Sequence, residues 1–212
     1  MSVALFALVA VSAANPAAGK FEDVMAGSAK LRIHFPAGYC KPEGTDVATF
    51  QVLAQGDQDN VTLLSLVECK KTSASRYVIF KAPVAFLGQA VNRKEAISEI
   101  AAALEGPEYR AKLESGEILN EVAKDKTVQN RSETEMSGQI LPRGHDDVCV
   151  YLGGMATTRT SEASQTQAMA ACLSVVGERL VSINAYEDSI DPAGYRAVMA
   201  RTREWMSLVE SQ

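Results

Sequence analysis

The chain has 212 residues, of which 47% are hydrophobic and 22% are charged, and its formal net charge is −5 at pH 7. This acidic balance, without a basic patch, argues against nucleic acid or an anionic membrane surface as the main partner. After the first residues, no apolar run approaches the length of about 18 residues that a membrane helix needs, so we do not expect an integral membrane protein.

The chain begins with an uncharged apolar run, MSVALFALVAVSAA. It is too short to cross a bilayer, and it ends in the small residues that precede signal-peptide cleavage sites. The pattern predicts a signal peptide at residues 1–14, a linker at 15–29 and a single domain at 30–212, exported to the periplasm or secreted. The run lacks the usual Lys or Arg before it, so a buried N-terminal helix is the alternative.

The first elements of the domain are a strand and a helix. Residues 31–35, LRIHF, alternate apolar and polar side chains, which is the period of a half-buried strand. Residues 46–55, DVATFQVLAQ, predict a short helix that Thr45 or Asp46 caps, with Phe50 on its apolar side.

The middle of the chain predicts a hairpin and two helices. Residues 61–69 and 76–82 are apolar strands separated by a polar turn. Residues 92–104 form the clearest helix, because Asn92 and Glu95 have the spacing of a capping box. A second helix follows from Pro107, and the polar residues 120–139 are interpreted as a solvated connection.

From residue 147 the pattern is a three-stranded meander with a tight turn at Gly177 and Glu178. Asp191 starts a final helix whose apolar residues recur at helical spacing as far as Val209. The elements together predict an α+β domain, with a largely antiparallel sheet of about five strands and helices packed on its faces.

The four cysteines are predicted to form two structural disulfides. If the loop after Thr158 turns near residues 160 and 161, Cys149 faces Cys172 across two strands, within the Cα separation that a disulfide tolerates. Cys40 and Cys69 then pair by elimination. The alternative makes Cys40 a reactive thiol, but it has no Cys-x-x-Cys partner.

The sequence contains no common nucleophile, zinc-binding or phosphate-loop motif, so no catalytic residue and no cofactor are assigned. The polar cluster His145, Asp146 and Asp147 could bind a divalent ion or act as a general base. The same residues are also typical of a solvated turn that enters a strand, and three consecutive strand residues cannot face one ligand.

Four aromatic residues could line a small-molecule pocket between the sheet and the final helix, but aromatic residues at this spacing more often belong to the core. The four residues are Tyr151, Tyr186, Tyr195 and Trp205.

The order of elements carries a family resemblance. A strand ending in Phe-Pro-Ala-Gly-Tyr-Cys40, a strand ending in Glu-Cys69-Lys and the closing strand RLVSINAY with its amphipathic helix resemble uncharacterised exported proteins of Gram-negative bacteria. More remotely, the arrangement resembles the antiparallel sandwich of the Mog1 and PsbP proteins. That resemblance implies a binding or assembly role and supplies no catalytic residues.

Our first hypothesis is therefore an exported, disulfide-stabilised domain that binds an envelope protein or a small ligand. The alternatives are a periplasmic hydrolase or metal-dependent enzyme that uses His145, Asp146 and Asp147, and a thiol oxidoreductase that uses Cys40. The sequence leaves the ligand, the oligomeric state and the biological process open.

Overall fold

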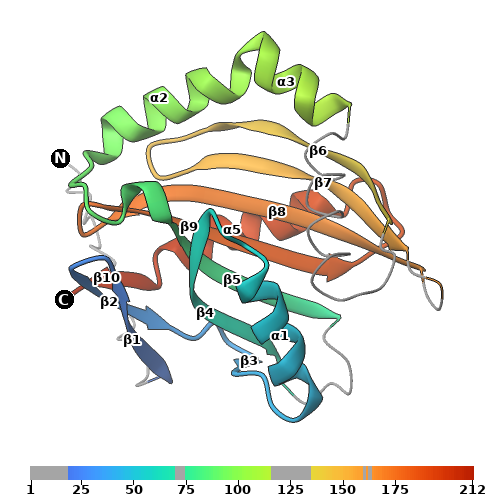
Figure 1. The fold of residues 1–212 in the computed structure, drawn as a ribbon, viewed down its shortest axis with the longest axis horizontal. Helices are drawn as coiled ribbons and strands as arrows, with labels where there is room; N and C mark the ends of the chain where they lie inside the picture. Colours follow the sequence, from blue (N-terminus) through green and yellow to red (C-terminus); the bar gives the residue numbers. More distant parts are fainter. Residues whose placement is uncertain (1–18, 70–74, 116–134, 160, 162–163) are drawn as a thin grey trace, which may run out of the picture.

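The computed structural model describes residues 19–69, 75–115, 135–159, 161 and 164–212. These residues form a seven-stranded sheet and a three-stranded sheet, both antiparallel, with α-helices packed around the larger one (Figure 1). The expected α+β domain with about five strands is wrong, because the described chain is mostly β. The strands that the sequence did not reveal are β1, β3, β6 and β10.

The large sheet has the strand order β3-β4-β5-β9-β8-β7-β6. The expected hairpin of β4 and β5 and the expected meander of β7, β8 and β9 are both present in it. The bounds of its strands are β3 Tyr39–Cys40, β4 Asn60–Glu68, β5 Arg76–Pro83, β6 Glu135–His145, β7 Val150–Arg159, β8 Ser164–Val176 and β9 Arg179–Asp188.

Strand β6 lies at the edge of the large sheet, within the segment 120–139 and just beyond it. The expected solvated connection is therefore wrong for residues 135–139, and residues 116–134 lie outside the described part of the chain. An edge strand tolerates Pro142, because only one of its sides must pair with a neighbour.

The small sheet joins both ends of the described chain. Its order is β1-β2-β10, with β1 at Phe21–Ala26, β2 at Ala29–His34 and β10 at Val209–Ser211. Strand β1 occupies residues that were expected to be a linker, and Val209 belongs to β10 and not to the final helix. Residues 1–14, the expected signal peptide, are outside the described residues.

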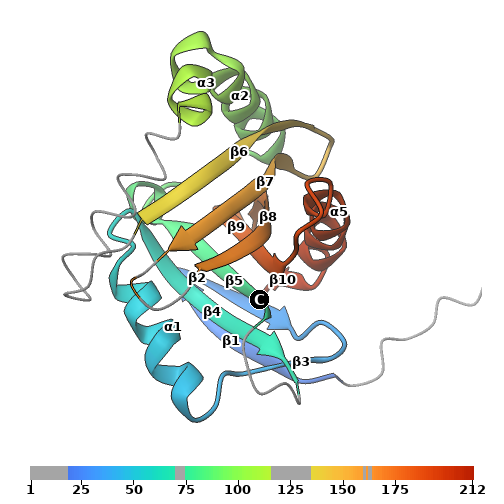
Figure 2. The same cartoon turned by 90° about the vertical axis from the view of Figure 1, so that its right-hand side faces the viewer.

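The two faces of the large sheet are covered by different elements (Figure 2). We call them the α5 face and the α1 face. The α5 face carries the main core, in which Ile183 of β9 packs with Val198 of α5 and with Ile33 of the small sheet. The α1 face is covered by α1 over β4 and β5 and by α2 and α3 over β6, β7 and β8.

Helices α1, α2 and α3 begin and end close to the predicted residues, whereas α5 begins at Tyr195 and not at the expected Asp191. Their bounds are α1 Thr45–Gln55, α2 Arg93–Glu105, α3 Pro107–Glu114 and α5 Tyr195–Met206. The Asn92 side chain accepts a hydrogen bond from the backbone N–H of Glu95, as the capping-box spacing predicts. Gly44 precedes α1 without any side-chain cap, so the expected capping by Thr45 or Asp46 is wrong.

The turn between β8 and β9 holds several distant segments together. Gly177 and Glu178 have φ values of 56° and 61°, which match a tight hairpin turn and favour glycine at the first position. The Glu178 carbonyl accepts from the backbone N–H of Val91, and Arg179 donates to Ser28. This turn therefore connects the large sheet to the loop before α2 and to the β1–β2 hairpin.

Candidate ligand-binding site

The structure contains two disulfides, Cys40–Cys69 and Cys149–Cys172, which are the pairs expected from the sequence. No cysteine of the described chain is free, so Cys40 offers no thiol for redox chemistry in this state. The expected register between β7 and β8 is wrong, because Cys172 lies opposite Tyr151 and not opposite Cys149.

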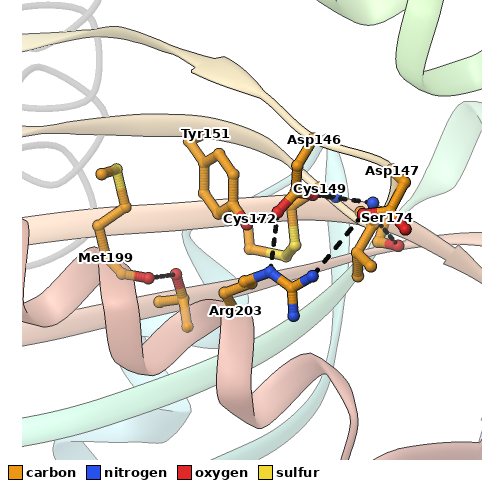
Figure 3. A network of polar contacts seen from close by, with 10 residues as sticks. Asp146, Asp147, Cys149, Tyr151, Cys172, Ser174, Met199 and Arg203 are labelled. Carbon is orange, nitrogen blue, oxygen red and sulfur yellow. Dashed lines mark hydrogen bonds and ion pairs between the residues drawn. A yellow bond between two sulfur atoms is a disulfide. The ribbon is translucent and has the colours of Figure 1, made fainter.

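Asp146 lies at the centre of a polar network between β7 and α5 (Figure 3). Its Oδ1 accepts from the backbone N–H groups of Val148 at 2.8 Å and Cys149 at 2.7 Å. Its Oδ2 accepts from the Tyr151 hydroxyl and from Arg203 Nε, both at 2.8 Å. The carboxylate thus joins the start of β7 to the last turn of α5.

The electrostatics of Asp146 follow from these contacts. Partial burial alone would raise the pKa of Asp146, but hydrogen bonds from Cys149, Tyr151, Val148 and Arg203 outweigh it and lower the pKa to about 2. Because each oxygen already accepts two hydrogen bonds, little acceptor capacity is left for a substrate or a metal ion. The geometry favours a structural role for Asp146.

The neighbours of Asp146 in the sequence do not join it in a site. His145 is exposed at the end of β6, where it pairs with Val150. Asp147 is 88% exposed and lies 3.7 Å from Arg203. Among the residues that the structure describes, no group of three or more His, Cys, Asp or Glu side chains is arranged to hold a metal ion.

The four aromatic residues that were considered as a possible pocket lining lie on two faces. Tyr151 and Trp205 are buried in the core of the α5 face, and Tyr195 packs against that core, with the Arg143 guanidinium 4.3 Å from its ring centroid. Tyr186 points to the α1 face. Between the sheet and the final helix, the other three side chains are therefore packed in or against the core, which is the interpretation that the sequence favoured.

An open cavity of about 170 Å³ lies on the other side of the sheet, on the α1 face. Tyr109 and Leu113 of α3 form one wall. The sheet forms the floor, through residues of four neighbouring strands: Ile140, Leu152, Met169, Ala170, Ala171, Asn184 and Tyr186.

Small side chains and helix placement explain the position of the cavity. Ala171 lies between Leu152 and Asn184 in the register, and Gly154 lies beside Met169 in the next row. Because these side chains are short, they leave space above the centre of the sheet on this face. Because α1 covers β4 and β5 while α2 and α3 cover β6 to β8, the face of β9 lies between the helices.

Tyr186 forms the boundary between the cavity and the core beneath α1. Its ring stacks on Tyr77 with centroids 4.5 Å apart, and the Tyr77 hydroxyl donates to Gln167 Oε1 at 3.3 Å. Burial raises the pKa of Tyr186, so its hydroxyl is neutral at physiological pH. The described residues that line the cavity thus present apolar surface, aromatic rings and neutral polar atoms, and none of them carries a carboxylate, ammonium or guanidinium group.

Of the described residues that line the cavity, only Tyr186 had been considered as a possible pocket residue from the sequence. A signal was available in RLVSINAYED, where Ser182, Asn184 and Tyr186 alternate with apolar residues on a strand at the centre of the large sheet. A polar residue in such a strand either finds a protein partner or faces a cavity. No comparable signal marks Tyr109, which reaches the site from a helix distant in sequence.

No helix in the described ranges has both the length and the apolar character to cross a membrane.

Comparisons with known proteins give little further information. No family model and no curated protein matches the chain. Among solved structures, the chain is similar to the solution structure of cyanobacterial PsbP (CyanoP) from Synechocystis sp. PCC 6803, with 9% identity and a TM-score of 0.38 over 98% of this chain and 99% of that chain. This agrees in kind with the PsbP resemblance expected from the sequence, but a similarity of this size supports no conclusion about function.

Proposed function

We propose that the protein is an exported binding domain, and that it takes a small, uncharged, mainly apolar ligand in the cavity between α3 and the large sheet. The observation that carries this proposal is the lining of the cavity, in which apolar and aromatic side chains surround a few neutral polar atoms. Small-molecule sites commonly have this composition. The cavity favours a small ligand over an envelope protein as the partner.

The size of the cavity limits the ligand. At about 170 Å³, it is comparable to an apolar cavity of about 150 Å³ that binds benzene in another protein. We expect a ligand of one substituted aromatic ring or a short aliphatic chain, with any larger part extending through the open side. Because none of the described lining residues carries a full charge, a charged group would lose its hydration without gaining a counter-charge from them.

Export is part of the same proposal. The two disulfides are consistent with an oxidising compartment, because such bonds persist outside the cytoplasm. The signal-peptide hypothesis concerns residues 1–14. The intact mass of the protein recovered from a secreting host tests it: removal of about this segment supports export, and its retention contradicts the signal-peptide assignment.

Binding can be tested with p-xylene as the probe, by saturation-transfer NMR and by its effect on the thermal unfolding midpoint. We expect binding to the unaltered protein and its loss in Ala171→Phe, because the new ring fills the floor of the cavity. Ala102→Phe adds the same ring on the exposed side of α2 and should bind p-xylene normally. Circular dichroism confirms that both variants fold.

Absence of p-xylene binding to the unaltered protein would contradict the proposal. So would equal binding to folded Ala171→Phe, since the probe would then occupy another place.

A further inference from the structure

One polar side chain in the floor of the cavity has an atom without a hydrogen-bond partner among the described residues. Asn184 Nδ2 donates to Ser182 Oγ at 2.9 Å and to the backbone carbonyl of Ile79 at 3.4 Å. A carbonyl oxygen only accepts hydrogen bonds, so the amide nitrogen must lie on this side. The orientation of the amide therefore directs Asn184 Oδ1 away from Ile79.

Asn184 Oδ1 accepts no hydrogen bond from any residue that the structure describes, although Asn184 is half-buried and lines the cavity. In its register row, Asn184 lies between Ile79 and Ala171, and Leu152 follows. Among these four neighbouring residues, Asn184 is thus the one with a polar side chain. A half-buried acceptor in such surroundings gains free energy when a donor fills it.

The surroundings define what kind of donor fits. An ammonium donor would need a carboxylate nearby, and the lining residues that the structure describes include no carboxylate. A neutral hydroxyl meets the requirement without a charge. The rings of Tyr109 and Tyr186 and the thioether of Met169 favour an aromatic body for the rest of the ligand.

We propose that Asn184 is the specificity-determining residue of this cavity, and that through Oδ1 it selects an uncharged aromatic ligand that carries a hydroxyl donor. This inference rests on the proposed function, because it concerns the same cavity. It adds the requirement that the ligand carry a hydrogen-bond donor, which apolar burial alone does not impose.

The test compares three probes of similar shape: p-cresol, which has a donor, 4-methylanisole, in which a methyl group blocks it, and p-xylene, which has no oxygen. Dissociation constants are measured by NMR titration. We expect the unaltered protein to bind p-cresol about fivefold to tenfold more tightly than 4-methylanisole, which corresponds to one neutral hydrogen bond.

The variant Asn184→Leu replaces the amide by an apolar group of similar size. It should lose the preference for p-cresol over 4-methylanisole while it still binds p-xylene. Leu152→Met, on the same row but without a hydrogen-bonding role, is the matched control and should keep the preference.

The outcomes separate the two proposals. If p-xylene binds but p-cresol and 4-methylanisole bind equally to the unaltered protein, Asn184 does not select a donor and only the proposed function survives. The same conclusion follows if folded Asn184→Leu keeps the preference. If none of the three probes binds, the proposed function itself fails.

Discussion

Cys172 lies directly opposite Tyr151 in the register of β7 and β8, but its sulfur is bonded to Cys149. In the same way, Cys40 faces Val67 across β3 and β4 and is bonded to Cys69. Each bridge joins a cysteine to the residue two positions from its register partner, on the same side of the ladder. Both disulfides are therefore diagonal links that oppose a shift of one strand along the other.

The two disulfides differ in burial, which predicts the order of their reduction. Cys149 and Cys172 are fully buried, whereas Cys40 and Cys69 are partly exposed. Because thiol–disulfide exchange needs access to a sulfur atom, we expect dithiothreitol to reduce Cys40–Cys69 first in the folded protein. Timed alkylation and peptide mass spectrometry give the order.

Reduction in denaturant is the control, because both bonds are then accessible and should open at similar rates. Reduction of Cys149–Cys172 first in the folded protein would show that burial does not set the order.

Asp146→Asn should destabilise the protein by about 1 to 3 kcal/mol, since it weakens charge-assisted hydrogen bonds at a partly buried position. Asp147→Asn is the matched control. Its carboxylate is 88% exposed, so we expect a change below about 0.5 kcal/mol. Urea unfolding of the two variants measures the difference, and equal effects would contradict a structural role for the Asp146 network.

The contribution of Asp146 should also depend on pH. Its pKa is lowered from 3.8 to about 2 in the folded protein, so the unfolded chain takes up the proton first as the pH falls. The stabilisation is complete above the unfolded pKa and is lost as the pH falls through about 2. The difference in stability between the unaltered protein and Asp146→Asn should therefore shrink between these values, and a difference independent of pH would be inconsistent with this origin.

Neighbouring glycines in β7 should differ in their tolerance of a methyl group. A Cβ on Gly154 would lie 1.7 Å from the backbone oxygen of Gln139, whereas one on Gly153 would lie 2.9 Å from Cδ2 of Tyr195, a side-chain atom that can move. We expect Gly154→Ala to cost about 3 kcal/mol or more and Gly153→Ala about 1 kcal/mol. Thermal and urea unfolding test this order. The reverse order would contradict the close approach of the β6 backbone to Gly154.

Elements with strong local signals could be predicted from the sequence. Asn92 and Glu95 specify the start of α2 through a contact within one helical turn. The β4–β5 hairpin and the meander follow from apolar runs separated by turns, because antiparallel neighbours are adjacent in the chain.

The strands that were missed depend on distant partners. Val209 continues the helical spacing of α5, and its strand conformation arises from pairing with Ile33, far away in the sequence. Strand β6 contains Gly138 and Pro142 and carries a weak strand signal, so its pairing with β7 decides its conformation.

In the candidate site, too, local contacts could be predicted from the sequence and contacts between distant residues could not. The sequence indicated a turn at Asp146, and the contacts to Val148 and Cys149 are local. Its partner Arg203 comes from the final helix. The cavity depends on α3 lying beside β6 and on the register of Ala171 with Asn184, neither of which is encoded by any short motif.

The small sheet has a practical consequence for how the protein can be held. Strands β1 and β10 flank β2 and pack with the core of the α5 face, while the cavity opens on the α1 face. Attaching the molecule to a solid support near residue 20 or residue 212 would therefore place the support on the side opposite the cavity. With either attachment point, the opening of the cavity would face the solvent.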